Sequence, residues 1–341
     1  MKKNVFFSLF ALGLLVVVFH SCSTDVELYA DYKDITVVYG LLDSSKDTNY
    51  IKINKAFLGP GDPFQIALID DSCNYPNKLD ARLIEYRAPS SGGTYQKTRV
   101  LPLDTITIHN KEAGFFYAPD QLVYYTKEKI NNNGSNYNYR YELQIDRGDT
   151  IITSFTNMVG GNTFAITPSQ LDVTAAAQNS FIKVHPCPNA AIYELKLKFY
   201  FTELTPSLDS TQRCMTMTLG MFPLADLETT NGSLNVPYQP SSFIPSLASF
   251  LGNDTLKNVE RLISEPSLVL SVAAGGEELY NFIAVNGPSN SIVQNIPEYT
   301  NVNGGYGVFS SRTLLQKKLR LSAQSLTDIT GRENWRFRQI Q

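Results

Sequence analysis

The longest strictly alternating run in the sequence is AAIYELKLKFYFTEL, residues 190–204. Its apolar positions fall two residues apart and form one face: Ala191, Tyr193, Leu195, Leu197, Phe199 and Phe201. Glu194, Lys196 and Lys198 lie between them on the opposite face. Because side chains alternate sides along a strand, the run predicts a long antiparallel strand with one buried and one solvated face.

Strand-forming patterns recur along the whole chain, whereas helical patterns are few. Tyr and Phe are each present 19 times, and aromatic residues are enriched in strands. Residues 141–159 have the pattern of the closing hairpin of an immunoglobulin-like (Ig-like) sandwich, with the RGD sequence 147–149 at its turn. We therefore expect a mainly β protein, with an N-terminal Ig-like β-sandwich at 35–160 and a β-rich α+β domain with a few short helices at 165–341.

Short helices are predicted only in the second domain. The segments 241–252, 254–265 and 276–286 have apolar residues at helical spacing, and a helical turn is expected near 325–331. The segment SLVLSVA between them predicts a buried strand, and the chain is expected to end in a strand that carries Trp335.

The strand pattern YNYRYELQI places three tyrosines, Tyr137, Tyr139 and Tyr141, on one face. Two interpretations are open: the rings fill the core of the first sandwich, or they form a contact surface for a partner.

The N-terminus has the pattern of a lipoprotein signal. Lys2 and Lys3 precede an apolar run at 5–19, which is shorter than the roughly 20 residues that span a bilayer, and Cys22 follows. We expect a signal peptide at 1–21, acylation of Cys22, and a lipidated tether at 22–34. The alternative is an ordinary secreted protein.

Charge and cysteine content restrict the remaining possibilities. The chain has 29 basic and 32 acidic residues, without the basic clusters that nucleic-acid binding requires. Besides Cys22 the chain has Cys73, Cys187 and Cys214, which do not have the spacing of a metal site. Cys187 and Cys214 could form a disulfide, or all three could be free thiols.

Motifs for catalysis are absent from the sequence. It has no HExxH and no G-x-S-x-G pattern, and its histidines after the signal segment are His109 and His185. Asp70 and Asp71 are adjacent, which does not suit a pair of carboxylates acting on one bond. We expect no catalytic residues, no metal site and no cofactor.

A resemblance emerges in the segment EELYNFIAVNGPSNSIVQNIPEYTNVNGGYGVFSSR, Glu277 to Arg312. Together with the strand at 190–204 and the lipoprotein signal, it resembles a group of Bacteroidetes outer-membrane lipoproteins of unknown function. The resemblance implies a lipid-anchored outer-membrane protein with an N-terminal Ig-like domain, and it implies no catalytic residue.

The NGGYG sequence at 303–307 permits two interpretations. Its three glycines allow positive φ and close approach of backbones, with Tyr306 and Phe309 anchoring the segment in a core. Alternatively, the glycines line a groove in which Tyr299, Tyr306 and Arg312 bind a ligand.

Together these features predict a non-catalytic cell-envelope lipoprotein that binds or organises a partner at the outer membrane. The partner would be an outer-membrane protein, as for an accessory of a TonB-dependent transporter or of a surface assembly, or a glycan or peptide ligand. The alternative is an envelope hydrolase of glycan or peptide with no recognisable motif. Whether the protein faces the periplasm or the outside stays open.

Overall fold

The computed structural model describes residues 33–58, 62–109, 112, 114, 117, 120–175, 180–207, 209–252, 259–287 and 298–340. The described chain is mainly β with a few short helices, which confirms the predicted fold class. The predicted signal peptide, Cys22 and the tether as far as residue 32 lie outside the described residues, and residues 33 and 34 already belong to the first strand.

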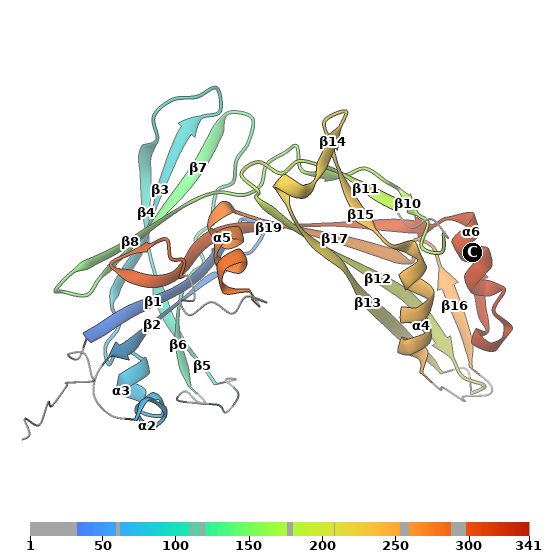
Figure 1. The fold of residues 1–341 in the computed structure, drawn as a ribbon, viewed down its shortest axis with the longest axis horizontal. Coiled ribbons are helices and arrows are strands. Elements are labelled where there is room, and N and C mark those ends of the chain that lie inside the picture. Colours follow the sequence, from blue (N-terminus) through green and yellow to red (C-terminus); the bar gives the residue numbers. More distant parts are fainter. Residues whose placement is uncertain are drawn as a thin grey trace, which may run out of the picture.

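Residues 33–157 form a lobe of two packed sheets (Figure 1). The first has the order β1-β2-β6-β5, and its strands are β1 (Lys33–Leu42), β2 (Asn49–Leu58), β6 (Gln121–Thr126) and β5 (Asp104–Ile108). The second has the order β18-β8-β7-β3-β4, with β18 (Val302–Asn303), β8 (Ile151–Asn157), β7 (Tyr137–Asp146), β3 (Asp80–Pro89) and β4 (Gln96–Pro102). The short helices α2 (Pro63–Ala67) and α3 (Asp70–Cys73) lie between β2 and β3.

The strand order agrees with an Ig-like arrangement. In chain order, the first two and the fifth and sixth strands share one sheet, as in the ABED sheet of such sandwiches. The remaining four share the other sheet, which corresponds to a CFG sheet with β4 added beside β3. The RGD sequence forms the β7–β8 turn as expected, with Gly148 at φ 89°. The lobe differs from an ordinary Ig-like sandwich because β18, and β19 (Gly305–Leu321), extend its sheets from the far end of the chain.

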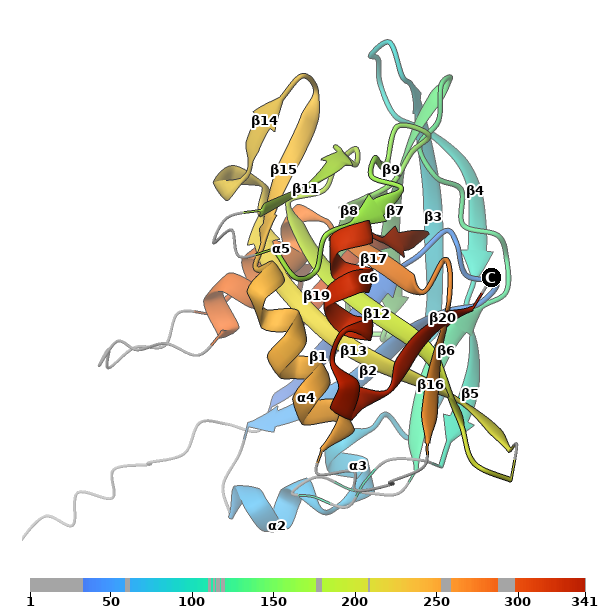
Figure 2. The ribbon, with the colours of Figure 1, turned by 90° about the vertical axis from the view of Figure 1, so that its right-hand side faces the viewer.

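The second lobe packs a large sheet against a small sheet and helices (Figure 2). The large sheet contains β10 (Gln170–Leu171), β12 (Ile192–Leu204), β13 (Ser210–Pro223), β16 (Glu260–Ser264), β17 (Leu268–Gly275), β19 and β20 (Phe337–Ile340), and through β19 it is continuous with β1, β2, β6 and β5 in one 11-stranded sheet. The small sheet has the order β14-β15-β11-β9, namely β14 (Glu228–Thr230), β15 (Ser233–Tyr238), β11 (Ser180–His185) and β9 (Ala165–Ile166). The helices are α4 (Phe243–Leu251) and α6 (Ala323–Thr330), with 3-10 turns at Leu224–Asp226, Pro240–Ser242 and Glu333–Trp335. Helix α5 (Glu277–Asn286) lies where the two lobes meet and contacts the first lobe.

The strand β12 behaves as its alternating sequence predicts. Its inward side chains are fully or almost fully buried in the core of the second lobe: Tyr193, Leu195, Leu197, Phe199 and Phe201. Glu194, Lys196 and Lys198 lie on the opposite, solvated face of the sheet. The strand pairs with β13 along its whole length and with β17 over residues 192–199.

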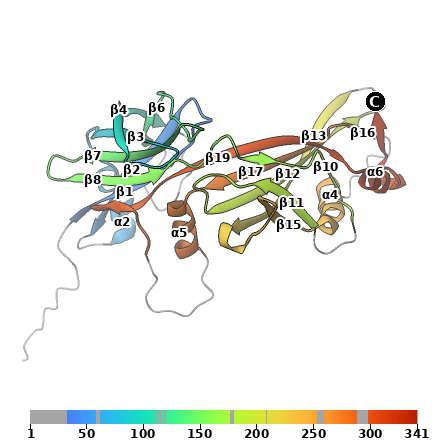
Figure 3. The same ribbon diagram turned by 90° about the horizontal axis from the view of Figure 1, so that it is seen from above.

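Strand β19 belongs to both lobes (Figure 3). Residues 305–311 pair in parallel with β1, and residues 312–319 pair antiparallel with β17. Phe309 and Val302 are buried in the core of the first lobe, whereas Leu319 and Leu321 are buried in the core of the second. The expected division into 35–160 and 165–341 therefore needs a correction, because β18 and the first half of β19 complete the first lobe.

Two elements of the second lobe differ from the prediction. The helix expected at 254–265 is wrong over its described part, because Glu260–Ser264 form strand β16, which pairs with β12 and β20. Residues 254–258 of that prediction lie outside the described residues. The alternation of buried Arg261 and Ile263 with less buried neighbours fits that strand, and sheet pairing outweighs the local helical spacing. Trp335 lies in a 3-10 turn, and the final strand begins at Phe337.

Candidate functional site

A groove runs along β19 where the two lobes meet, and we call it the junction groove. It consists of two adjoining cavities of about 640 and about 270 Å³ that share Asp43, Lys46 and Arg312. The larger cavity is lined by β1, the β1–β2 turn, the start of β2, α5 and β19. The smaller cavity extends over the solvated face of β12, β17 and β19.

The alternation of β19 explains why a single strand can line the groove and fill two cores. Its odd-numbered residues Phe309 and Leu319 point into the first and the second core, respectively. Its even-numbered residues Val308, Arg312 and Leu314 line the groove. Since successive side chains of a strand point to opposite faces, the groove follows one face of β19 across the junction.

The larger cavity is mainly apolar. Its apolar lining comes from Tyr39, Leu41, Tyr50, Leu279, Phe282, Ile283 and Val308. Tyr39 and Tyr50 are large aromatic residues that remain 47% and 50% exposed, respectively. The ring of Phe282 stands edge-on to Tyr39 with the centroids 6.0 Å apart, a favourable aromatic geometry. Helix α5 thus forms one apolar wall of the groove.

The position of α5 depends on its first turn. Glu277 and Glu278 lie there, where a helix dipole favours negative charge. Glu278 accepts hydrogen bonds from Ser310 on β19 at 2.8 Å and from Thr156 on β8 at 3.2 Å. Burial raises the pKa of Glu278, and these hydroxyl donors partly offset that effect. The contacts fasten the helix to both sheets of the first lobe.

The centre of the groove carries a buried carboxylate. Asp43 is 2% exposed, and its Oδ1 accepts hydrogen bonds from the backbone and the hydroxyl of Ser45. Its Oδ2 has no hydrogen-bond partner among the described residues and lies 3.9 Å from Nε of Arg312. Asn49 exchanges two hydrogen bonds with the Asp43 backbone, which holds the turn in place. Asp43 is therefore fixed, whereas Arg312 is only loosely held and is half exposed.

The smaller cavity is polar and mainly cationic. Lys196 and Lys198 of β12, Lys46 of the turn and Arg312 of β19 contribute positive charge. Glu194 lies in the same cavity and forms an ion pair with Lys196 at 2.8 Å. Within the described part of the chain, Lys46 and Lys198 form no ion pair. This end of the groove therefore presents a surplus of positive charge next to the apolar end.

Of the three binding residues proposed from the sequence, Arg312 lies in the junction groove. Tyr306 is on the same face of β19 but outside the lining, and it is 45% exposed, so it does not anchor its segment in a core. Tyr299 lies against α5, where burial raises its pKa and a hydrogen bond with Asn281 partly offsets that effect. The structure thus does not gather the three residues into one site.

The glycines of NGGYG have a structural role in this fold. Gly304 and Gly307 have φ of 81° and 106°. A Cβ on Gly305 would lie 2.6 Å from the carbonyl oxygen of Thr36, and one on Gly307 would lie 2.0 Å from that of Val38. The glycines therefore allow β19 to pair closely with β1.

Tyr137, Tyr139 and Tyr141 divide between core and surface. Tyr141 is fully buried, Tyr139 packs against the core, and Tyr137 is 38% exposed. The Tyr141 hydroxyl donates to Glu85 at 2.5 Å and accepts from the backbone of Asn131 at 2.8 Å. The core interpretation therefore holds for Tyr141 and, in part, for Tyr139.

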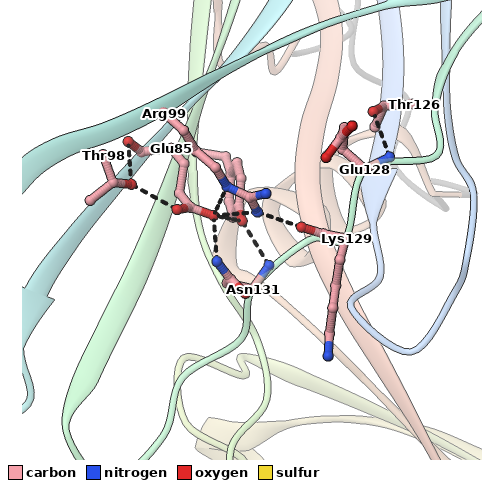
Figure 4. Close-up of polar contacts among 8 residues, drawn as sticks. Glu85, Thr98, Arg99, Thr126, Glu128, Lys129 and Asn131 are labelled. Carbon is pink, nitrogen blue, oxygen red and sulfur yellow. Dashed lines mark hydrogen bonds and ion pairs between the residues drawn. The ribbon is translucent and has the colours of Figure 1, made fainter.

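Glu85 is the centre of a buried polar network in the first lobe (Figure 4). Besides Tyr141, it accepts hydrogen bonds from Thr98 at 2.7 Å, from Asn131 at 2.9 Å, and from Arg99 at 2.8 and 3.0 Å. Arg99 also donates to the carbonyl of Lys129. Burial raises the pKa of Glu85, but the bonds from Arg99, Tyr141 and Thr98 lower it further than burial raises it. The network is satisfied internally and joins β3, β4, β7 and the loop before β7.

The cysteine pair considered above is not formed. Cys73, Cys187 and Cys214 are free thiols. Cys187 is buried in the core of the second lobe. On β13, Met215 points into that core, so Cys214 points to the opposite face of the sheet, away from Cys187.

The described residues include no group of His, Cys, Asp and Glu that could hold a metal ion. His109 is exposed and pairs with Asp120 at 2.7 Å, and His185 is exposed at the end of β11. None of the described helices is both long enough and apolar enough to cross a membrane. What the junction groove offers is an apolar wall, a fixed carboxylate and exposed cations, which are groups suited to binding.

Sequence reasoning missed most of the groove. Asp43 and Lys46 lie in DSSKD, a segment that predicts only a turn, and Tyr39 lies in a strand with no distinguishing pattern. Phe282 lies in a predicted helix, but the surface that it faces is formed by residues over 200 positions away. The sequence did contain one indication of the groove, namely the two lysines Lys196 and Lys198 on the solvated face of the alternating strand.

No protein-family model matches the chain, and no curated protein matches it either. Among solved structures, a similarity is found to the C-terminal globular domain of an oligosaccharyltransferase from Pyrococcus abyssi, with 10% sequence identity and a TM-score of 0.21. The matched region covers 71% of this chain and 46% of that one, so the chain spans less than half of that structure. A similarity at this level supports no statement about the function of this chain.

Proposed function

We propose that this chain is a cell-envelope lipoprotein that is anchored at the outer membrane through Cys22 and holds a partner in the junction groove without turning over a substrate. The proposed partner is an outer-membrane protein, such as a TonB-dependent transporter or a component of a surface assembly. The lipoprotein signal and the Bacteroidetes resemblance support the location, and the groove supports the binding role.

The observation that carries the proposal is the exposed apolar wall of the groove. Tyr39 and Tyr50 keep about half of their surface in solvent beside Leu279, Phe282 and Ile283. Contiguous exposed apolar surface on a folded protein marks an interaction site, and tyrosines are enriched where partners bind. Membrane anchoring would also raise the local concentration of the protein near such a partner, so that a weak contact would be sufficient.

Site-specific photo-crosslinking in native cells tests the proposal. A photoreactive phenylalanine analogue replaces Tyr39, and the matched control replaces Phe181, which is 54% exposed on β11 and outside the groove. We expect the Tyr39 probe, but not the Phe181 probe, to give a crosslink to one outer-membrane protein. The additional changes Phe282→Ser and Cys22→Ala should each abolish that crosslink.

Two results would contradict the proposal. The first is the same set of crosslinked proteins from both probes, because contact would then be unrelated to the groove. The second is hydrolysis of a glycan or peptide by the purified protein, abolished by a single carboxylate or serine substitution. That outcome would favour the envelope hydrolase.

A further inference from the structure

The two ends of the junction groove differ in character, and the difference indicates what chemistry a partner must have. The end beside α5 is apolar, and it combines the aromatic rings of Tyr39, Tyr50 and Phe282 with aliphatic side chains, namely Leu41, Leu279, Ile283 and Val308. The apolar side chains that α5, β1 and β19 present here suit an apolar side chain of a peptide, and Leu41, Leu279, Ile283 and Val308 offer no hydrogen-bond partner to the hydroxyl groups of a sugar. The apolar end therefore favours a peptide over a glycan.

The cationic end is arranged as a row along the strands. On the solvated face, Lys196 of β12 is opposite Ser271 of β17, which is opposite Gln316 of β19. In the same way Lys198 is opposite Val269, which is opposite Lys318. Lys196 and Lys198 are two residues apart on β12, which separates them by about 7 Å along the strand. Side chains at positions i and i+2 of an extended peptide have the same separation.

Arg312 lies between the two ends and is available to a ligand. Its Nε is 3.9 Å from the unpartnered Oδ2 of Asp43, which is too long for a hydrogen bond. Its side chain is 51% exposed, so the guanidinium can bind an incoming carboxylate with two parallel hydrogen bonds. Asp43 is buried and fixed beside Arg312, and the groove stays net positive because Lys46, Lys196, Lys198 and Arg312 outnumber Asp43 and Glu194.

From this arrangement we infer that the partner enters the junction groove as an extended acidic peptide segment. An apolar side chain of the segment occupies the end beside α5, and carboxylates at alternate positions contact Arg312, Lys196 and Lys198. This inference rests on the proposed binding role of the groove and specifies the chemistry of the partner.

Fluorescence anisotropy with the full-length protein in detergent tests the inference. The probe is a dye-labelled peptide that has Leu-Phe followed by three glutamates alternating with serines. A second peptide has glutamine in place of every glutamate, and polygalacturonate represents an acidic glycan. We expect the acidic peptide to bind at least tenfold more tightly than the glutamine peptide, and its affinity to fall as salt increases.

Variants locate the binding site. Arg312→Gln and Lys198→Gln should each weaken binding of the acidic peptide by about fivefold or more, which corresponds to about 1 kcal/mol. Phe282→Ser should weaken the binding of both peptides. The control Lys183→Gln removes an exposed lysine of β11 outside the groove and should leave binding unchanged.

Each contrary result has a definite meaning. Equal affinity for the two peptides, no binding of the acidic peptide at millimolar concentration, or indifference to Arg312→Gln and Lys198→Gln would overturn the inference. Binding of polygalacturonate in place of the peptide would show a glycan site instead. These outcomes leave the proposed function intact if the Tyr39 crosslink is still observed, so the two proposals can fail separately.

Discussion

Replacement of Gly307 by alanine should separate the two sheets that β19 joins. Gly307 has φ of 106°, and a Cβ there would lie 2.0 Å from the carbonyl oxygen and 2.9 Å from the carbonyl carbon of Val38. Both atoms belong to the backbone of β1, so the clash cannot be relieved by a side-chain rotation. The strand must move away from β1, which breaks part of the parallel pairing over residues 305–311.

The magnitude follows from two contributions. A non-glycine residue at positive φ costs roughly 1–2 kcal/mol, and each lost hydrogen bond of the ladder costs about 0.5–1.5 kcal/mol. With two or three bonds lost, Gly307→Ala should reduce the free energy of unfolding by about 2–6 kcal/mol. Gly304 provides the control, because it also has positive φ, while the nearest atom to its Cβ is Ile152 Cδ1 at 3.9 Å.

Urea unfolding measures the difference. Far-ultraviolet circular dichroism follows both lobes, and the fluorescence of Trp335, the single tryptophan, follows the second lobe. We expect Gly304→Ala to cost about 1–2 kcal/mol, as its backbone strain alone requires. If the two variants have unfolding free energies within about 0.5 kcal/mol of each other, then close backbone approach is not what requires Gly307, and the reasoning is refuted.

Three further outcomes are expected. Cys22→Ala should abolish labelling by a fatty-acid analogue in cells and leave the precursor unprocessed, and normal processing would remove the lipoprotein assignment. The folded-state pKa of Glu85 lies below its unfolded value, so the ionised Glu85 stabilises the protein above the unfolded pKa, and this stabilisation is lost as pH falls through the folded pKa. Glu85→Gln should therefore reduce the loss of unfolding free energy at acid pH. An unchanged loss at acid pH would contradict this role of Glu85. Burial raises the pKa of Cys187 to about 12, so Cys187 should stay unmodified by a thiol reagent at neutral pH while the half-buried Cys214 reacts, and equal rates would contradict this.

The parts of the fold that could be predicted are those in which local pattern and tertiary environment agree. The alternation of residues 190–204 matches a strand with one buried face, and the turn residues Gly148 and Asp149 match the hairpin at 147–149. The helix predicted at 254–265 was wrong for β16 because the spacing of Val259 and Ile263 fits a helix and a strand equally well. Only the pairing of β16 with β12 and β20 decides between the two structures.

The junction groove could not be predicted as a unit. Its lining comes from three stretches, 39–50, 279–283 and 308–316, and from β12 and β17, and the parallel register of β1 with β19 joins residues about 270 positions apart. Arg312 was identified because it ends a conspicuous block. The neighbouring Asp43 was not identified from the sequence, because whether a carboxylate in a turn is buried depends on the tertiary packing around it.

The sharing of β19 also affects the order in which the protein can fold. The first lobe is synthesised early, yet one of its core side chains is Phe309 and one of its edges is closed by residues 305–311. A ribosome making about 5–20 residues per second needs roughly 7 to 30 seconds to pass from the end of β8 to the start of β19. Until then β1 keeps one edge unpaired, so we expect the early lobe to remain incompletely folded for most of synthesis. If the chain is exported as we propose, this order would keep it incompletely folded, and so able to cross a membrane, until residues 305–311 pair with β1.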